Sequence, residues 1–147
     1  FLPEIFMILI FLQIVFGAFV SGMDAGKIYN TWPLMGNSYF PDDNKIINLF
    51  EFSALSDASL VQYLHRNIAY LIFILYIIIT FTVYKNKIVI LFKPILILGF
   101  VVFLQIFLGI LTLLSGAGIL ISSLHQVSSI LLITASLYFL YKNKFSF

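Results

Sequence analysis

The chain has 147 residues, of which 62% are hydrophobic and only 10% charged, and its mean hydropathy is +1.11. This composition is typical of an integral membrane protein and excludes an ordinary soluble domain. The formal net charge of +2 is too small to suggest a nucleic-acid partner. The sequence contains no cysteine, which excludes disulfides, thiolate metal sites and a thiol nucleophile.

Four long apolar segments predict four transmembrane helices. Each segment is close to the ~20 residues that a helix needs to cross a bilayer, and the segments cover about residues 3–22, 60–84, 93–115 and 119–141. The first could be mistaken for a signal peptide, but it carries Glu4 where a signal peptide has basic residues, so we interpret it as a helix of the mature protein. The expected fold is therefore an all-α bundle that spans the bilayer and covers residues 1–147, with lipid as its surroundings.

The connections between these segments predict which side of the membrane each one faces. Segment 23–59 is long, rich in turn residues and net acidic, whereas the link at 115–118 is tight. The lysines of the other connection and of the C-terminal tail all fall on the opposite side, and they are Lys85, Lys87, Lys93, Lys142 and Lys144. The positive-inside rule then places both termini on the cytoplasmic or matrix side of a bacterial or mitochondrial inner membrane, with loop 23–59 outside.

A weak internal repeat divides the chain into two helical hairpins. The segment 11–17, Phe-Leu-Gln-Ile-Val-Phe-Gly, matches 103–109, Phe-Leu-Gln-Ile-Phe-Leu-Gly, and each is followed by a Ser-Gly pair. The two hairpins would share one membrane orientation, as parallel repeats do about an axis along the membrane normal. Chance is the alternative, because Phe, Leu and Ile are so common in this sequence.

The only two histidines, His65 and His125, are the candidate metal ligands. They lie about five and six residues into the second and fourth segments, which run in the same direction, so both lie ~8–9 Å below the outer edge. Equal depth on parallel helices would let two imidazoles ligate a heme iron from both sides. The alternative is that each histidine makes a structural hydrogen bond between helices. Zinc is disfavoured because no acidic side chain or cysteine lies near them at ligand spacing.

Other polar or small residues near these histidines have two possible roles each. Arg66 could pair with a heme propionate or extend toward lipid phosphate. Gly17 and Gly109 could permit close helix packing, which is favoured, or make room for a porphyrin. Gln13 and Gln105 are expected to bond across helices, with a direct role at a cofactor as the alternative.

Several segments resemble heme A synthases, in the order in which that family has them. The matching segments are 17–26, 29–36, 61–66, 105–114 and 124–126. In the alphaproteobacterial and mitochondrial branch, which the loop resembles most, such a chain would be the C-terminal four-helix half of an eight-helix protein. The resemblance implies an oxidoreductase that oxidises a methyl group of heme O to a formyl group, giving heme A for cytochrome oxidase.

The same resemblance implies a cofactor and partners. It makes His65 and His125 the axial ligands of a heme b, with Arg66 beside it, and it assigns no catalytic residue to this half. The other half carries an essential Glu where this chain has Gln62, so the isolated half is expected to be inactive. Expected partners are heme O in the other half, heme O synthase and a second copy of the chain. The alternative functions are a stand-alone membrane cytochrome b and a transporter or assembly subunit with structural histidines.

Overall fold

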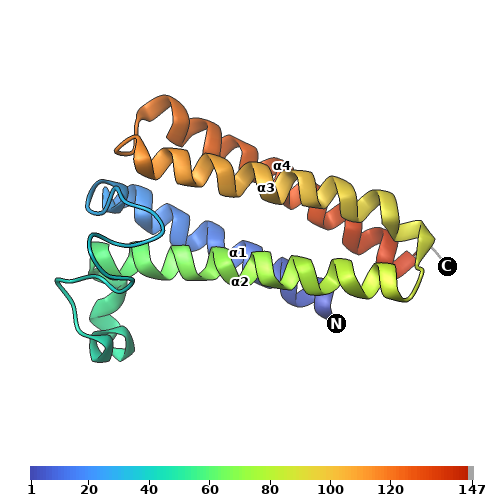
Figure 1. Ribbon diagram of the computed structural model, residues 1–147, viewed down its shortest axis with the longest axis horizontal. Helices are drawn as coiled ribbons and strands as arrows, with labels where there is room; N and C mark the ends of the chain where they lie inside the picture. The colour runs from blue at the N-terminus through green and yellow to red at the C-terminus, as the bar shows by residue number, and fades with distance from the viewer. Residues whose placement is uncertain (146–147) are drawn as a thin grey trace.

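The computed structural model describes residues 1–145 and shows an all-α fold (Figure 1). The long helices are α1 (Leu2–Gly22), α2 (Ala58–Lys85), α3 (Phe92–Leu114) and α4 (Ile119–Phe145). The short 3-10 helices are η1 (Ala25–Lys27), η2 (Ile46–Phe50), η3 (Phe52–Ser56) and η4 (Val89–Leu91). Residues 146–147, the end of the expected bundle, lie outside the described residues.

Local sequence explains where two of the long helices begin and end. The Asp57 side chain accepts a hydrogen bond of 2.9 Å from the Leu60 backbone amide, so it caps α2, which begins at Ala58 rather than at residue 60. α4 continues to Phe145, beyond the apolar segment that ends near Tyr141, because polar residues can extend a helix into the interface. All four long helices are long and apolar enough to cross a membrane, as expected.

The helices form two antiparallel hairpins, α1–α2 and α3–α4, that lie against each other (Figure 1). Between the hairpins, α1 packs against α4 and α2 packs against α3. Both termini lie at one end of the bundle, and loop 23–59 and the 115–118 turn lie at the other. The expected architecture, an integral membrane bundle of two hairpins, is confirmed.

The packed core occupies the half of the bundle nearer the termini. It includes Phe6 and Ile10 of α1, Ile95 and Leu98 of α3, and Phe139 of α4, all almost fully buried. An ion pair of 3.1 Å between Lys144 and Glu4 joins α4 to α1 at the same end. This end therefore holds the hairpins together by close van der Waals packing, which replaces the hydrophobic effect between helices in lipid.

Tyr76 of α2 packs against Gly99 of α3. The Tyr76 hydroxyl donates to the Ile95 carbonyl at 3.4 Å, and the hydroxyl end of the ring fills the space beside Gly99. A Cβ atom added at Gly99 would lie 2.0 Å from that hydroxyl oxygen. Glycine at this position therefore allows the two hairpins to approach.

Candidate functional site

The outer half of the bundle is packed more loosely than the core, and it contains both histidines. The last buried residue of α1 is Ile10, and the first buried residue of α4 is Ser128. Between these levels and the outer ends, the side chains of α1 and α4 are only partly buried or exposed. This zone also contains the polar and small residues near the histidines, namely Gln13, Gly17, Arg66, Gln105 and Gly109. Its loose packing is compatible with a large group that enters between the hairpins.

His65 is held against α1 by two residues one helical turn apart. Its ring Nε2 lies 3.2 Å from the amide nitrogen of Gln13. A Cβ atom added at Gly17 would lie 3.3 Å from the ring carbon Cε1, which is tighter than an ordinary van der Waals contact. Gln13 and Gly17 thus form a shallow seat on α1 that fits the imidazole closely.

His125 has a corresponding seat on α3. A Cβ atom added at Gly109 would lie 3.2 Å from Cε1 of His125. Gln105 lies one turn before this glycine, but its amide donates to the Ser128 hydroxyl at 2.6 Å and to the His125 backbone carbonyl at 3.4 Å. The expectation that both glutamines bond across helices is confirmed. The second seat therefore reproduces the glycine contact but not the bond to the ring.

The two imidazoles lie at similar depth in the outer half of the bundle. His65 lies seven residues after Ala58, where α2 begins, and His125 lies six residues after Ile119, where α4 begins. Within residues 1–145 the Nδ1 atom of each ring is buried and has no hydrogen-bond partner. Buried polar atoms without partners are costly and are retained mostly at functional sites. The residues present therefore fit a group ligated by both rings.

A metal site built from protein ligands alone does not fit this zone. Among residues 1–145, no group of three or more His, Cys, Asp or Glu side chains is placed to hold a metal ion. A heme needs only two protein ligands, because the porphyrin nitrogens provide the other four. The donor set of two histidines thus favours heme over a bare metal ion.

Arg66 and Gln62 clamp the outer loop onto α2. The Arg66 guanidinium donates to the carbonyls of Thr31 and Leu34 through Nη1, at 3.0 and 3.2 Å, and to that of Tyr29 through Nη2, at 3.0 Å. Gln62 donates to the same Tyr29 carbonyl at 3.1 Å. Both expected roles of Arg66, toward a propionate or toward lipid, stay predictions, and the contact with the loop is a third role that sequence reasoning missed.

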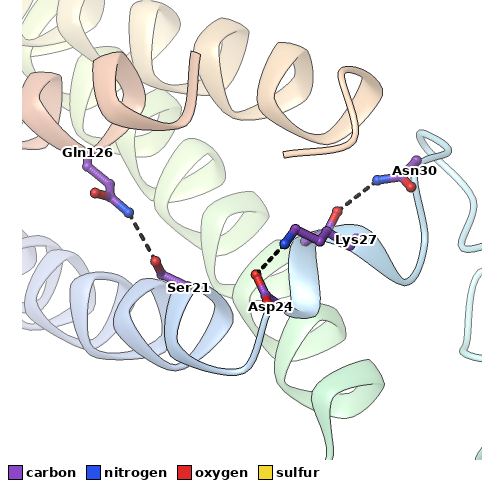
Figure 2. A network of polar contacts seen from close by, with 6 residues as sticks. Ser21, Asp24, Lys27, Asn30 and Gln126 are labelled. Carbon is purple, nitrogen blue, oxygen red and sulfur yellow. Dashed lines mark hydrogen bonds and ion pairs between the residues drawn. The ribbon is translucent and has the colours of Figure 1, made fainter. Parts of the chain in front are cut away.

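Hydrogen bonds also bridge the outer ends of the two hairpins (Figure 2). Gln126 of α4 donates to the Ser21 hydroxyl of α1 at 3.3 Å. Asn30 in the loop donates to the Leu113 carbonyl at the end of α3 at 3.0 Å. These contacts fix the spacing of the hairpins above the histidines, where the apolar core does not reach.

Asp43 organises the loop where it meets the start of α2. Its carboxylate accepts hydrogen bonds from Ser59 at 2.6 Å, from Tyr29 at 3.1 Å and from Asn44 at 3.4 Å. Burial opposes the charged form, but these hydrogen bonds outweigh it and hold the pKa of Asp43 below its usual value. Burial and the nearby Asp43 charge also raise the pKa of Tyr29. The loop thus carries a fixed anion close to the outer end of the site.

The described residues thus define a helical membrane protein whose two histidines lie in the outer half of the bundle. Residues 2–137 match the family model COX15-CtaA, described as Cytochrome oxidase assembly protein. The chain belongs to this family.

Curated relatives agree with the family model. The chain is 43% identical to heme A synthase of Pelagibacter ubique (strain HTCC1062) over 97% of its own length and 43% of the relative's. It is 42% identical to that of Wolbachia pipientis wMel, over 92% of the chain and 37% of the relative. It is 37% identical to that of Rickettsia prowazekii (strain Madrid E), over 91% of the chain and 40% of the relative. The chain therefore spans less than half the length of these relatives, and no solved structure matches it.

The resemblance to heme A synthases is thereby confirmed. The structure places both predicted histidines in the outer half of the bundle and bonds Arg66 to loop 23–59, and the roles of all three toward a cofactor stay predictions. The sequence analysis missed the direct contacts of Gly17 and Gly109 with the imidazoles. The repeated Gln-x-x-x-Gly spacing was the available signal, because it puts the two residues one turn apart on the same helix face.

Proposed function

We propose that this chain is the C-terminal, cofactor-holding half of a heme A synthase with eight helices. The observation that carries the proposal is the matched pair of imidazoles, each seated against a glycine of its own hairpin and each with a buried Nδ1 that has no partner in the described residues. Membership of the cytochrome oxidase assembly family and the greater length of the relatives support it.

In this proposal, His65 and His125 bind the iron of a heme b, and Arg66 lies close enough to the outer edge to pair with a propionate. The Arg66 Nε atom is buried and makes no hydrogen bond within residues 1–145, so the guanidinium keeps one donor for an anion while it holds the loop. When bound, a six-coordinate heme supplies one-electron transfer. The protein contributes the position of the rings, the exclusion of water and the fixed charge of the guanidinium.

The oxidation itself belongs, in this proposal, to the half that this chain does not contain. Conversion of the heme O methyl group to a formyl group adds an oxygen atom and removes electrons and protons from the substrate, and a heme held by His65 and His125 would supply one-electron chemistry beside it. Gln62 is neutral, is 2% exposed and is already bonded to the Tyr29 carbonyl, so it cannot act as a carboxylate base. Heme O is thus the substrate of the other half, and heme O synthase and a second copy of the chain are the proposed partners.

The membrane orientation follows from the charge distribution. The two helix ends that carry Lys85, Lys142 and Lys144 lie at the end of the bundle where both termini lie (Figure 1). The positive-inside rule supports a cytoplasmic or matrix location for this end, in a bacterial or mitochondrial inner membrane. Loop 23–59 then lies on the outer side.

The test is the absorption spectrum of the full-length protein purified from membranes. We expect a low-spin b-type spectrum on reduction, and we expect it to be lost in both His65→Ala and His125→Ala, because either change leaves the iron with one protein ligand. A low-spin spectrum that survives in either variant removes that histidine from the ligand set. A wild-type protein that binds no heme overturns the proposal.

The same spectrum separates the synthase from a stand-alone cytochrome when it is combined with an activity measurement. Heme O supplied to the full-length protein should be converted to heme A, whereas a pure electron carrier would show the b-type spectrum and no conversion. Extraction and chromatography of the heme provide that measurement.

A further inference from the structure

The two histidine seats share one steric feature. In both hairpins the imidazole Cε1 faces a glycine on the neighbouring helix, and an added Cβ would lie 3.3 Å away at Gly17 and 3.2 Å away at Gly109. Both distances are shorter than ordinary van der Waals contact between carbon atoms, which is about 3.5–4.0 Å. Even the smallest side chain would therefore push the ring away from its helix.

The seats differ in the amide that lies one turn before the glycine. In the first hairpin the Gln13 amide reaches the ring nitrogen Nε2 of His65, whereas in the second the Gln105 amide is taken up by Ser128. Ser128 lies three residues after His125, and the residue three after His65 is Ile68, which has no acceptor in its side chain. The difference between the two glutamines thus follows from one residue on the histidine-bearing helix.

The Gln13 contact also selects a form of the ring. With the amide oriented as in the structure, its N–H group can only donate, so the contact requires an unprotonated Nε2 and places the proton on Nδ1. This is the tautomer that can bind iron through Nε2 once the Gln13 amide has released that atom. No side chain among residues 1–145 hydrogen-bonds to the ring of His125, so its tautomer is not selected in this way.

We infer that Gly17 and Gly109 are positioning residues that set the orientation of the two imidazoles, and that Gln13 holds His65 in its ligand-ready tautomer before heme binds. The inference rests on the proposed function, since it concerns the rings that would ligate the heme. Groups that orient a metal-ligating histidine tune both the affinity and the electronic properties of the metal. Gly17, Gly109 and Gln13 belong to the helices opposite the histidines, and they act on the imidazoles rather than as ligands themselves.

The glycines are tested in the full-length protein with the variants Gly17→Ala and Gly109→Ala. The matched control is Gly22→Ala, because Gly22 is also in α1 but an added Cβ there meets no atom within 4 Å. We expect both seat variants to shift the electron paramagnetic resonance g-values and the midpoint potential of the low-spin heme and to weaken heme retention by about tenfold. The control should match wild type in all three measurements.

The outcomes distinguish a failure of the positioning role of the two glycines from a failure of the proposed function. If wild type binds low-spin heme and both seat variants give g-values, potentials and retention equal to those of the control, only the positioning role is overturned. If wild type binds no heme, the proposed function fails and the positioning role fails with it. Far-ultraviolet circular dichroism of each variant checks that the helices persist, so that a lost spectrum reports on the ligands and not on folding.

The role of Gln13 is tested in protein without heme, so the result does not depend on how well the variant binds heme. In heme-depleted protein with nitrogen-15-labelled histidine, Gln13→Leu should reduce the population of His65 with an unprotonated Nε2. Gln105→Leu is the matched control, because it removes an amide of the same size that does not touch a ring nitrogen. Unchanged nitrogen signals of His65 in Gln13→Leu overturn the tautomer role.

Discussion

The two hairpins present a histidine in the same way but support it differently. In the α1–α2 hairpin, the ring of His65 is bonded by Gln13, and the next residue, Arg66, reaches out to the loop. In the α3–α4 hairpin, the Gln105 amide is bonded to Ser128 of α4 and does not reach the ring of His125. A repeat can therefore keep the geometry that a cofactor requires while its two copies acquire separate structural tasks. The first hairpin anchors the outer loop, and the second closes with a tight turn.

The contact between Tyr76 of α2 and Gly99 of α3 gives the largest expected effect of a substitution. Gly99→Ala would place a methyl group 2.0 Å from the Tyr76 hydroxyl oxygen and 2.8 Å from the ring carbon Cζ. Overpacking of this kind costs about 1–3 kcal/mol. We expect the upper part of that range, because Tyr76 and Gly99 both lie inside long helices that cannot easily move apart. The loss should appear as a lower thermal unfolding temperature in detergent.

Tyr76→Phe in the Gly99→Ala background should recover part of that loss, since it removes the closest atom and leaves the 2.8 Å contact. A double variant no more stable than Gly99→Ala would show that the tyrosine hydroxyl is not the source of the strain.

The loop clamp of the first hairpin has no counterpart in the second, so Arg66→Gln should loosen loop 23–59 and leave the 115–118 turn unchanged. The change removes the guanidinium that donates to three loop carbonyls, and hydrogen bonds to charged groups contribute about 1.5–3 kcal/mol each when buried, less when partly exposed as here. We expect a destabilisation of about 2 kcal/mol. Amide hydrogen exchange should rise in the loop and stay unchanged in the 115–118 turn; equal rises in both would argue against a local clamp.

Ser128 and Ile68, which lie three residues after His125 and His65, can each be substituted to test why the two glutamines bond differently. Ser128→Ala removes the acceptor of a buried hydrogen bond of 2.6 Å and should destabilise the protein by about 1 kcal/mol, while it frees the Gln105 amide to approach the ring of His125. Ile68→Ser should draw the Gln13 amide away from His65. Nitrogen-15 chemical shifts of the two histidines measure both effects, and opposite shifts in the two variants are the expected result.

The smallest expected effect is the pH dependence of the loop. The pKa of Asp43 is lowered in the folded protein, so its contribution to stability is complete above the unfolded-state pKa of about 4 and is lost as the pH falls through the lower folded-state value. Amide exchange near Tyr29 and Ser59 should therefore increase, relative to the rest of the chain, only below about pH 4. Asp43→Asn should abolish that acid-specific increase, and an unchanged pH profile in this variant would assign the effect to another carboxylate.

The sequence was sufficient for the parts of the fold that depend on local composition. The four apolar segments gave the helices because an apolar run of ~20 residues in lipid has few alternatives to a helix. The shifts in their ends came from Asp57, whose cap lengthens α2, and from the polar end of α4. Within the loop, residues 46–56 form two 3-10 helices separated at Glu51, which adopts an extended conformation, and neither has a hydrophobic run long enough to stand out in the sequence.

The candidate site was only partly predictable. The histidines stand out because titratable residues are rare in apolar segments. The role of Arg66 toward the loop could not be read from the sequence, because the carbonyls of Tyr29, Thr31 and Leu34 converge on it from more than thirty positions away. A backbone carbonyl has no signature in an amino-acid sequence, and only the folded loop shows where it lies.

The Tyr29 carbonyl accepts hydrogen bonds from Gln62 and Arg66, which lie on either side of His65 along α2. A single atom of the loop is thus tied to the helix turn that carries the histidine. Any movement of that turn is therefore transmitted to the loop through these hydrogen bonds. Loop 23–59 thus reports the position of the part of α2 that carries His65, and a probe placed on the loop could follow it from outside the membrane.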